Sequence, residues 1–511
     1  MATARRSIGS VVAALIATTT ITAVDSIVLS SEARAQQTLR VGNTAFGPRK
    51  GQVHWAFAAA DVMPLMAFFD SLTYVDAEAK LQPGLATSWQ AQGNDTWIFK
   101  LRPGVRFHNG KPMDAAAVVA NVEYILTDEG KTTSGGRMLN DFVITGRAID
   151  ATTVEIKTKV PQPIMDRWFA LFRPMEVGAY REMGPEGFGV KPIGTGSFRV
   201  VSWTPEGIRA EAFPEAWRKP KVERLVINEL PENAARLQAL TSGQIDIAWS
   251  LTPDDGPRIA AAGGSVSVTP VGDVVSMGFN LIKDSPFKDV RVRRALSHGV
   301  DRESFVKNVL GGLTKSAGQP AASNIAGHVP AIRPYAYDPV RSKALLAEAG
   351  FLNGLKAKIE IVTFGDFGVA MQNMASDLAR VGVELELINL TIPDFIQRFV
   401  GQKAWDGIGI STIYEPFPTA DVMRALVTQS CSGRGNFICD RTIQPTIEAA
   451  NVETDPAKRT ALVTQIMQYY HDNALSLYLY EAIQVTGLAR NVRNYKMANR
   501  APNYHEIELA R

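Results

Sequence analysis

The chain has 511 residues, of which 46% are hydrophobic and 21% charged, so it can bury a large core and is neither disordered nor fibrous. Its formal net charge is only +3, without a long block of either sign, which excludes a nucleic-acid-binding footprint and a polybasic membrane patch. The 41 glycines and 28 prolines are spread without a period, as is typical of a globular, loop-rich protein.

The first 35 residues have the pattern of an export signal. The basic pair Arg5-Arg6 precedes a charge-free stretch, residues 7–24, and Ala33-Arg34-Ala35 forms a small-x-small cleavage site. We predict a signal peptide over residues 1–35, cleaved after Ala35, and a mature protein in the periplasm. The alternative is an uncleaved anchor helix, which the many threonines of the stretch disfavour.

Short extended runs then alternate with helical patterns. Residues 97–101 and 105–107 are β-rich, and Asn109-Gly110 is typical of a tight turn. Asp114 is placed to cap a helix whose apolar residues recur on one side as far as Ile125. The same alternation of strand and helix continues along the chain.

Later helices begin with clear signals. Asp338-Pro339 predicts a helix over residues 340–349, and Asp455-Pro456 predicts another that runs toward Tyr470. Extended runs lie around them, at residues 224–229, 274–279, 358–362, 383–388 and 475–480. This pattern predicts an α/β fold. Because no long Pro/Ser/Gly linker separates the segments, we expect interwoven domains.

The two cysteines, Cys431 and Cys439, are close together in an exported chain, which favours a disulfide between them. A metal site or a redox pair is the alternative. The spacing is not Cys-x-x-Cys and no histidine accompanies it, so both alternatives are disfavoured.

Motifs of common enzyme classes are missing from the sequence. There is no Gly-x-Ser-x-Gly, phosphate loop, His-Glu-x-x-His or dinucleotide fingerprint, and the six histidines are scattered. Asp254-Asp255 lies between prolines and is typical of a turn. We therefore predict no enzyme: no catalytic residue, no metal site and no cofactor. A secreted hydrolase with a site assembled by tertiary contacts and a chaperone-like protein remain as distant alternatives.

Several motifs occur in an order known from one family. They are Leu81-Gln-Pro-Gly-Leu-Ala-Thr-Ser-Trp89, residues 96–113, Gly194-Thr-Gly-Ser-Phe-Arg199, Leu240-Thr-Ser-Gly-Gln-Ile-Asp-Ile247, and Phe279-Asn280 with Val290-Arg-Val-Arg-Arg-Ala-Leu296. In these motifs the chain resembles the family-five extracellular solute-binding proteins of ABC transporters, and the resemblance covers nearly the whole mature chain.

The resemblance implies an α/β, two-lobed periplasmic-binding-protein fold of class II with a ligand cleft between the lobes. The first lobe would comprise residues 36–272, with an extra subdomain, and residues 481–511; the second would comprise residues 273–480. The chain would cross near residues 272–280 and return near residues 480–484. Ligand contacts to both lobes would favour a closed state.

The function implied is that of the substrate-binding component of an ABC importer. It would capture a peptide or peptide-like solute and deliver it to an inner-membrane permease with its ATPase subunits. We expect a monomer without cofactor or nucleic-acid partner. A receptor for an opine or an oligosaccharide of the same family is the alternative.

The resemblance also points to ligand residues. Peptide binders of the family hold the free amino group with an aspartate in the segment that here spans residues 410–418, where Glu415 is the only carboxylate. Glu415 could take that role, or it could only shape a Glu-Pro turn. Dipeptide binders hold the carboxylate with an arginine before the helix here predicted over residues 369–381. No basic residue lies between Lys358 and Arg380, which weakens the case for a plain dipeptide.

Further candidates are chosen by residue type and position. Aromatic side chains offer flat contact surfaces, and segments that follow strands are where α/β clefts collect ligand groups. Arg137, after two glycines in a polar loop, is the candidate partner for an anion, although it could simply be solvated. The predicted ligand residues are Phe46, Arg137, Trp249, Phe364, Asp366, Trp405, Tyr414, Glu415 and Phe417.

Overall fold

The computed structural model describes residues 37–363, 367–400 and 405–510 and shows a mixed α/β protein. The predicted signal peptide and its cleavage site lie outside the described residues, as do the candidate ligand residues Phe364 and Asp366. Within the described ranges, no helix combines the length and hydrophobicity needed to cross a membrane. The same residues contain no group of three or more His, Cys, Asp or Glu side chains placed to hold a metal ion.

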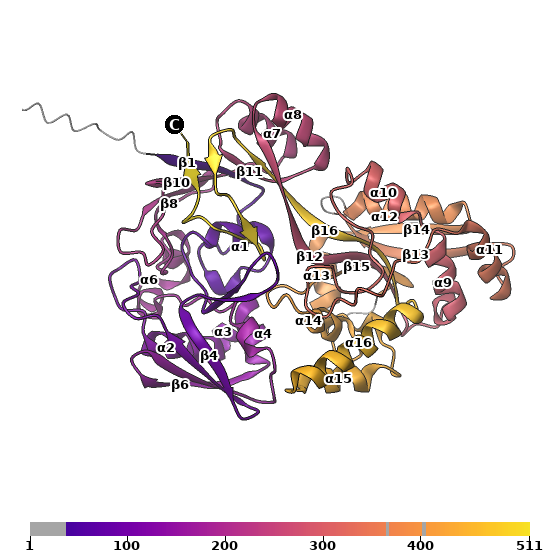
Figure 1. Ribbon diagram of the computed structural model, residues 1–511, viewed down its shortest axis with the longest axis horizontal. Helices are drawn as coiled ribbons and strands as arrows, with labels where there is room; N and C mark the ends of the chain where they lie inside the picture. Colours follow the sequence, from indigo (N-terminus) through magenta and orange to yellow (C-terminus); the bar gives the residue numbers. More distant parts are fainter. Residues whose placement is uncertain (1–36, 364–366, 401–404, 511) are drawn as a thin grey trace, which may run out of the picture. The chain divides into compact units, whose positions relative to one another are not determined.

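A ten-stranded mixed sheet is the main element of the fold (Figure 1). Its strands follow the order β14 (Val383–Leu390), β13 (Leu355–Val362), β15 (Gly409–Tyr414), β12 (Ser265–Phe279), β16 (Ser476–Leu488), β11 (Ile247–Leu251), β1 (Thr38–Asn43), β10 (Arg224–Glu229), β9 (Gly207–Ala212) and β8 (Phe198–Trp203). Five of the predicted extended runs, at residues 224–229, 274–279, 358–362, 383–388 and 475–480, lie in this sheet within one residue of a strand, so those predictions are confirmed.

The two longest strands, β12 and β16, pair antiparallel along most of their length and join the two halves of the sheet (Figure 1). Their register shifts between Pro270 and Val274. Gly272 lies in this interruption with a φ of 86°, a conformation that favours glycine. A Cβ atom at Gly272 would lie 2.4 Å from Ile325 Cδ1, so the backbone there also has no room for a side chain.

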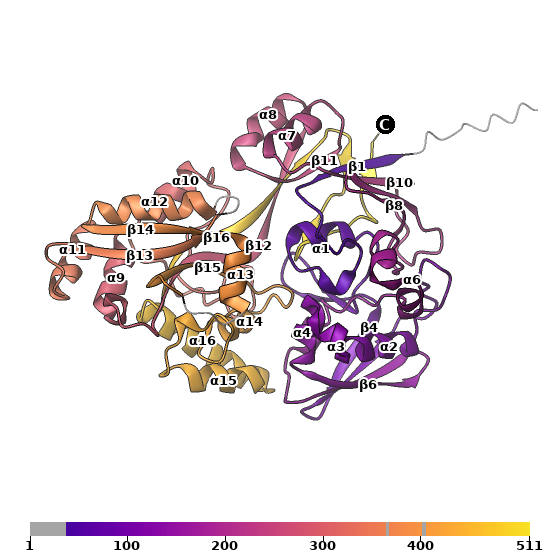
Figure 2. The same cartoon turned by 180° about the vertical axis from the view of Figure 1, so that it is seen from behind.

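Helices cover the half of the sheet formed by β13, β14 and β15. A core of apolar side chains joins these strands to α9 (Val290–His298), α11 (Pro339–Glu348) and α12 (Phe367–Ala379). Figure 2 shows α12 alongside β14. A second core holds α14 (Val422–Gln429), α15 (Gln444–Val452) and α16 (Pro456–Asp472) against β15. The predicted helices at 340–349 and from Asp455-Pro456 are confirmed as α11 and α16.

The N-terminal half contains a second, four-stranded antiparallel sheet. Its order is β4 (Ala86–Gln92), β5 (Thr96–Leu101), β7 (Thr153–Thr158) and β6 (Val143–Asp150), and α2 (Ala115–Leu126) packs against it. The Asp114 side chain caps α2 by accepting a hydrogen bond from Ala117 N at 3.0 Å, as predicted. Residues 105–107 do not form the predicted strand: only Arg106 makes a single bridge, to Pro112, because the chain turns back at Asn109-Gly110.

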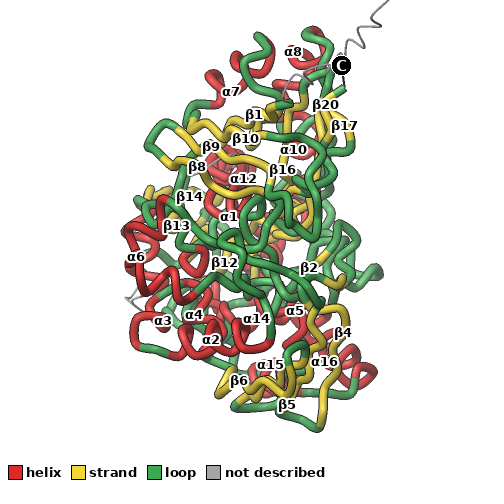
Figure 3. Tube along the Cα trace, turned by 90° about the vertical axis from the view of Figure 1, so that its left-hand side faces the viewer, coloured by secondary structure: helices red, strands yellow, loops and turns green. Residues whose placement is uncertain are grey.

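Shorter elements complete the described chain. The helices are α1 (Ala59–Leu65), α3 (Asp128–Thr132), α4 (Ser134–Asn140), α5 (Met165–Trp168), α6 (Val177–Val190), α7 (Asn233–Thr241), α8 (Gly256–Ala261), α10 (Arg302–Asn308) and α13 (Ile392–Val400), with short 3-10 helices at Val53–Trp55, Pro253–Asp255, Pro286–Lys288 and Asn436–Ile438. Three two-stranded ribbons pair β2 (Thr73–Val75) with β3 (Leu81–Pro83), β17 (Val492–Arg493) with β20 (Glu508–Leu509), and β18 (Met497–Ala498) with β19 (Ala501–Pro502). Figure 3 shows β17 and β20 side by side near the C-terminus.

The buried apolar residues fall into groups that follow the two halves of the main sheet. The largest group comes almost wholly from residues 39–249 and 492–507, with Phe417 as its member from elsewhere. The next two groups come from residues 274–480, apart from Val75 and Ala170. The chain therefore builds its first core from both ends of the described sequence and the others from its middle.

Two local predictions can be compared with the structure. Cys431 and Cys439 are joined by a disulfide. Asp255 accepts hydrogen bonds from the backbone and the hydroxyl of Thr252, each at 2.9 Å, so the acidic pair takes part in a turn as expected.

Candidate functional site

Four charged side chains from distant parts of the sequence meet beside the register shift of β12; we call them the charge cluster. Asp273 is on β12, Glu415 follows β15, Arg424 is in α14, and Arg500 is in the turn between β18 and β19. Arg500 Nη2 lies 2.9 Å from Asp273 Oδ2 and 2.7 Å from Glu415 Oε1. Arg424 Nη1 lies 3.0 Å from Glu415 Oε2 and donates to the Glu415 carbonyl at 2.6 Å.

The charge cluster is largely withdrawn from solvent. The side chains of Asp273, Arg500 and Glu415 are 9%, 10% and 21% exposed. Burial raises the pKa of Asp273 to about 6, against the opposing effect of Arg500, and the second oxygen of Asp273, Oδ1, has no hydrogen-bond partner. Burial also opposes ionisation of Glu415, but the charges of Arg500 and Arg424 outweigh it and lower the pKa of Glu415. With both carboxylates ionised, the cluster is neutral.

Two phenylalanine rings pack on the arginines of the charge cluster. The Arg500 guanidinium carbon lies 4.7 Å from the ring centre of Phe417, and that of Arg424 lies 5.4 Å from the ring centre of Phe57. The two rings are 5.5 Å apart, edge to face. These contacts place each guanidinium against an aromatic face, which stabilises a desolvated cation.

The loop that carries Glu415 and Phe417, residues 415–421, is held by both halves of the chain; we call it the bridging loop. Asn499 Nδ2 donates to the Pro418 carbonyl at 2.7 Å, and Arg167 Nη1 donates to the Thr419 carbonyl at 3.0 Å. On the other side, Arg459 makes two hydrogen bonds to the Asp421 carboxylate, at 2.9 and 3.0 Å. The loop therefore joins the middle of the chain to both of its ends.

Two of the nine predicted ligand residues, Glu415 and Phe417, are brought together at the charge cluster. Three others are buried in the packed interior. Trp249 lies edge to face against Tyr504, Trp405 packs on the ring of Phe437, and the Tyr414 hydroxyl is hydrogen-bonded to Ser476 Oγ at 2.8 Å. These three side chains contribute to cores in this structure.

Phe46 and Arg137 lie apart from the charge cluster. Phe46 is half-buried against Trp203, with ring centres 5.6 Å apart. Arg137 donates to the Thr132 carbonyl at 3.1 Å, close by in sequence. Neither contact involves the bridging loop.

Sequence reasoning missed Asp273, Arg424, Arg500 and Phe57. Asp273 had a usable signal, because it follows a glycine within an otherwise apolar extended run. Arg500 had none: it comes to Asp273 across 227 residues, through a C-terminal turn that only tertiary packing places there.

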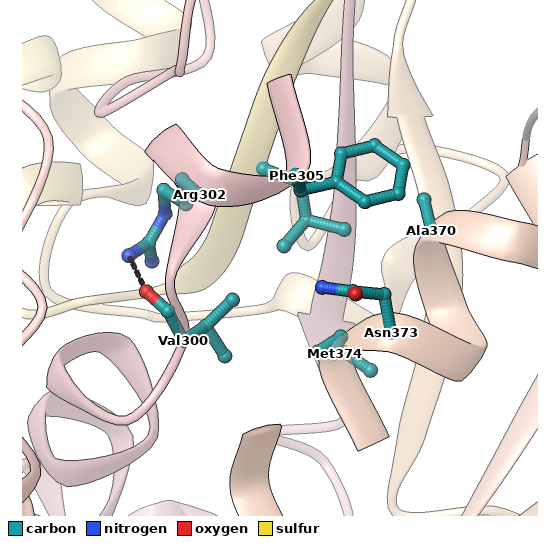
Figure 4. Close-up of a pocket in the computed structure, with 7 residues that line it drawn as sticks. Val300, Arg302, Phe305, Ala370, Asn373 and Met374 are labelled. Carbon is teal, nitrogen blue, oxygen red and sulfur yellow. Dashed lines mark hydrogen bonds between the residues drawn. The ribbon is translucent and has the colours of Figure 1, made fainter. Parts of the chain in front are cut away.

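Two cavities lie away from the charge cluster. A small apolar cavity of about 10 Å³ is lined by α10, α12 and β16 residues, including Phe305, Ala370 and Met374 (Figure 4). It has room for about one water molecule, so it is too small for a ligand. A cavity of about 270 Å³ is formed where α2 and α6 meet, with Lys111 and Glu176 at its polar side. Neither cavity includes a residue of the charge cluster.

Comparisons with known proteins agree with this architecture. The sequence profile of bacterial extracellular solute-binding proteins, family 5 Middle, matches residues 80–431. Di/tripeptide-binding protein 2 of Pseudomonas aeruginosa is 26% identical over 461 residues, which cover 83% of this chain and 86% of that protein. The glutathione-binding protein GsiB of Pectobacterium atrosepticum is 26% identical over 333 residues, 63% of each chain.

Among solved structures, the ABC transporter substrate-binding protein CtaP of Listeria monocytogenes has a TM-score of 0.82 at 20% identity. The superposition covers 93% of this chain and all of that one. At this identity the likeness is one of fold: the two-lobed α/β fold of the periplasmic binding proteins.

Proposed function

We propose the function of this chain from one premise: it belongs to the bacterial extracellular solute-binding proteins of family 5. The two-lobed α/β fold expected from the sequence is confirmed. Proteins of this family bind solutes for transport, and nothing in the comparisons supports the hydrolase alternative.

The solute that we propose is a peptide or peptide-like compound. Relatives at 26% identity are named for di- and tripeptide binding and for glutathione binding, and glutathione is itself a peptide-like compound. The protein would act in the periplasm as a monomer, after removal of residues 1–35, and deliver its ligand to an ABC permease driven by ATPase subunits.

The lobes that we propose are residues 36–272 with 481–511, and residues 273–480. The grouping of the buried apolar residues supports these bounds. The hinge would lie where β12 and β16 cross, at the register shift between Pro270 and Val274. A hinge needs a few residues that absorb a change in backbone angles, and Gly272 at this shift is such a residue.

The observation that carries the proposal is the ion pair between Arg500 and Glu415. It joins the proposed first lobe to the bridging loop of the second at 2.7 Å, beside the proposed hinge. Separation of the lobes breaks this pair and exposes both charges to water. A ligand that contacts both lobes therefore favours the arrangement in which the pair is made.

Glu415 keeps its proposed role as a partner of the ligand amino group, but it does not act alone. Its two oxygens already face Arg500 and Arg424, and about a fifth of its side chain stays exposed. An ammonium group would share the carboxylate with both arginines. We therefore expect Glu415 to orient the amine and to contribute only part of the affinity.

The experiment that tests the proposal is a thermal-shift series with the purified protein. Ligand that binds only the native state stabilises it, by about 2.7 kcal/mol at 100 times Kd. We expect di- and tripeptides and glutathione to raise Tm, and an opine and an oligosaccharide to leave it unchanged. The Glu415→Gln variant should weaken the peptide effect, whereas Glu386→Gln, at an exposed position of β14, should not.

The opposite pattern would refute the peptide assignment. If the peptides leave Tm unchanged while the opine or the oligosaccharide raises it, the protein is a receptor for one of those solutes, as in the alternative derived from the sequence. Peptide turnover by the purified protein would instead support an enzyme.

A further inference from the structure

Arg173 is a buried arginine without a partner. Its side chain belongs to a residue only 3% exposed, in the segment between α5 and α6. In the part of the chain that the structure describes, its guanidinium makes no hydrogen bond or ion pair, and its Nε is sealed from solvent. Burial lowers the pKa of Arg173 to about 10, so it remains a cation at neutral pH.

Three other buried arginines of the same protein each have several hydrogen-bond partners. Arg302 donates to the carbonyls of Ser297, Val300 and Tyr478, and Figure 4 shows its bond to Val300. Arg236 donates to the carbonyls of Leu230, Pro231, Trp249 and Ser250, and Arg293 to those of Phe287, Lys288 and Asn473. These three guanidinium groups are held by backbone carbonyls, and those of Arg500, Arg424 and Arg459 by carboxylates, whereas Arg173 has neither among the described residues.

Among the described residues, no carboxylate acts on Arg173, whose pKa is shifted by burial alone. The charge of Arg173 does act on His54, whose pKa is lowered to about 4, mainly by burial. His54 is therefore neutral at pH 7. Its Nε2 lies 3.4 Å from Asn121 Oδ1, which also accepts a hydrogen bond from Met175 N.

Arg173 lies among segments that reach the bridging loop. The preceding helix α5 carries Arg167, which donates to the Thr419 carbonyl, and the segment of His54 continues to Phe57, which packs on Phe417. Two segments near Arg173, one beside it in the chain and one carrying His54, therefore contact the bridging loop.

An unpaired buried cation destabilises a folded protein unless a counter-charge pairs with it. We propose that Arg173 is the anion anchor of the ligand site and that the ligand of this protein carries a carboxylate, which pairs with the Arg173 guanidinium. This inference rests on the proposed peptide function and deepens it, since it assigns a partner to the peptide C-terminus. It also accounts for the carboxylate partner missing between Lys358 and Arg380.

The test compares trialanine with trialanine amide, which differ in the charge of the C-terminus, by isothermal titration calorimetry. The wild type should bind trialanine at least 10-fold more tightly than the amide. Arg173→Met should lose that preference and bind the amide within about 3-fold of the wild type. Arg181→Met, at an exposed position of α6, is the matched control and should keep the preference.

Stability of the ligand-free protein gives an independent readout. Removal of a partnered structural arginine, as in Arg302→Met, should lower Tm by several degrees. Arg173→Met should leave Tm unchanged or raise it, because it removes an unpaired buried charge. A clear fall in Tm, or failure of Arg173→Met to fold, would show that Arg173 is structural and would overturn the inference.

The remaining outcomes separate the inference from the peptide proposal. Equal binding of trialanine and its amide by the wild type overturns the anion anchor and leaves the peptide proposal standing. If neither trialanine nor its amide binds, the peptide proposal fails. The inference is then tested with glutarate, a small dicarboxylate, which should raise Tm of the wild type but not of Arg173→Met. No rise with glutarate overturns it.

Discussion

Removal of Arg500 should lower the stability of the protein more than the loss of any exposed ion pair. Arg500→Met leaves Asp273 and Glu415 buried with one cation fewer, and loss of one partner of a buried ion pair costs about 3–5 kcal/mol. The upper half of this range applies here, because Arg500 serves two carboxylates, at 2.9 and 2.7 Å. The Asp273 carboxylate loses its only ion-pair partner among the described residues and its Oδ1 already lacks a hydrogen bond, whereas Glu415 keeps its ion pair with Arg424.

Part of this loss should be recovered by a second change. Asp273→Asn removes the charge that Arg500→Met leaves unpaired, so the double variant should be at least about 1 kcal/mol more stable than Arg500→Met alone. The loss should also shrink at pH 5, because the uncompensated Asp273 carboxyl, whose pKa is about 6 even beside Arg500, is then protonated.

The assay is urea unfolding followed by circular dichroism, at pH 7 and pH 5. The matched control is Arg147→Met, which breaks a pair between Glu155 and the exposed Arg147 and should cost far less than Arg500→Met, because water solvates that guanidinium. A loss for Arg500→Met no larger than that of the control would refute the view that the buried charge cluster depends on Arg500 for its stability. Failure of Asp273→Asn to recover any stability would refute the assignment of the cost to the Asp273 charge.

Three further predictions concern other residues. Burial lowers the pKa of His54 to about 4, below its usual 6.5, so His54 contributes stability that is complete above pH 6.5 and lost as pH falls toward 4; His54→Phe should flatten urea-derived stability over that window. Reduction of the Cys431–Cys439 disulfide, which closes a loop of separation 8, should cost about 2–3 kcal/mol in urea unfolding, and a reduced protein of equal stability would contradict this estimate. Gly272→Ala places a Cβ 2.4 Å from Ile325 at a φ of 86° and should cost about 1–3 kcal/mol by the same assay, with partial recovery on adding Ile325→Ala.

Elements whose signals are local could be predicted from the sequence. Asp114, Asp338 and Asp455 each accept hydrogen bonds from backbone N–H groups at the start of the helix they were expected to begin. A capping residue bonds backbone groups within the next turn, so the residues that decide a cap are close together in the sequence. The expected strand at residues 105–107 was wrong because a β-rich run becomes a strand only when another segment pairs with it, and here the chain turns back on itself.

The residues of the site show the limit of such reasoning. Glu415 and Phe417 could be chosen from the sequence because a family pattern marks their segment. Their partners could not, since Asp273 and Arg500 are separated by 227 residues. Aromatic side chains after strands gave an equal signal whether they pack in a core, as Trp249 and Tyr414 do, or face a charged group.

The sequence by itself determined the alternation of strands and helices, the caps and the family, because these depend on short spacings along the chain. Only the tertiary structure decided which charges meet. Arg500 reaches Asp273 and Glu415 because β16, which pairs with β12 and β11, carries the C-terminal segment back to the N-terminal half of the chain. The difference between Arg173 and Arg302 is also decided only by the tertiary structure. Both are buried, but Arg302 donates to the distant carbonyl of Tyr478, whereas no carbonyl of the described chain accepts a hydrogen bond from Arg173.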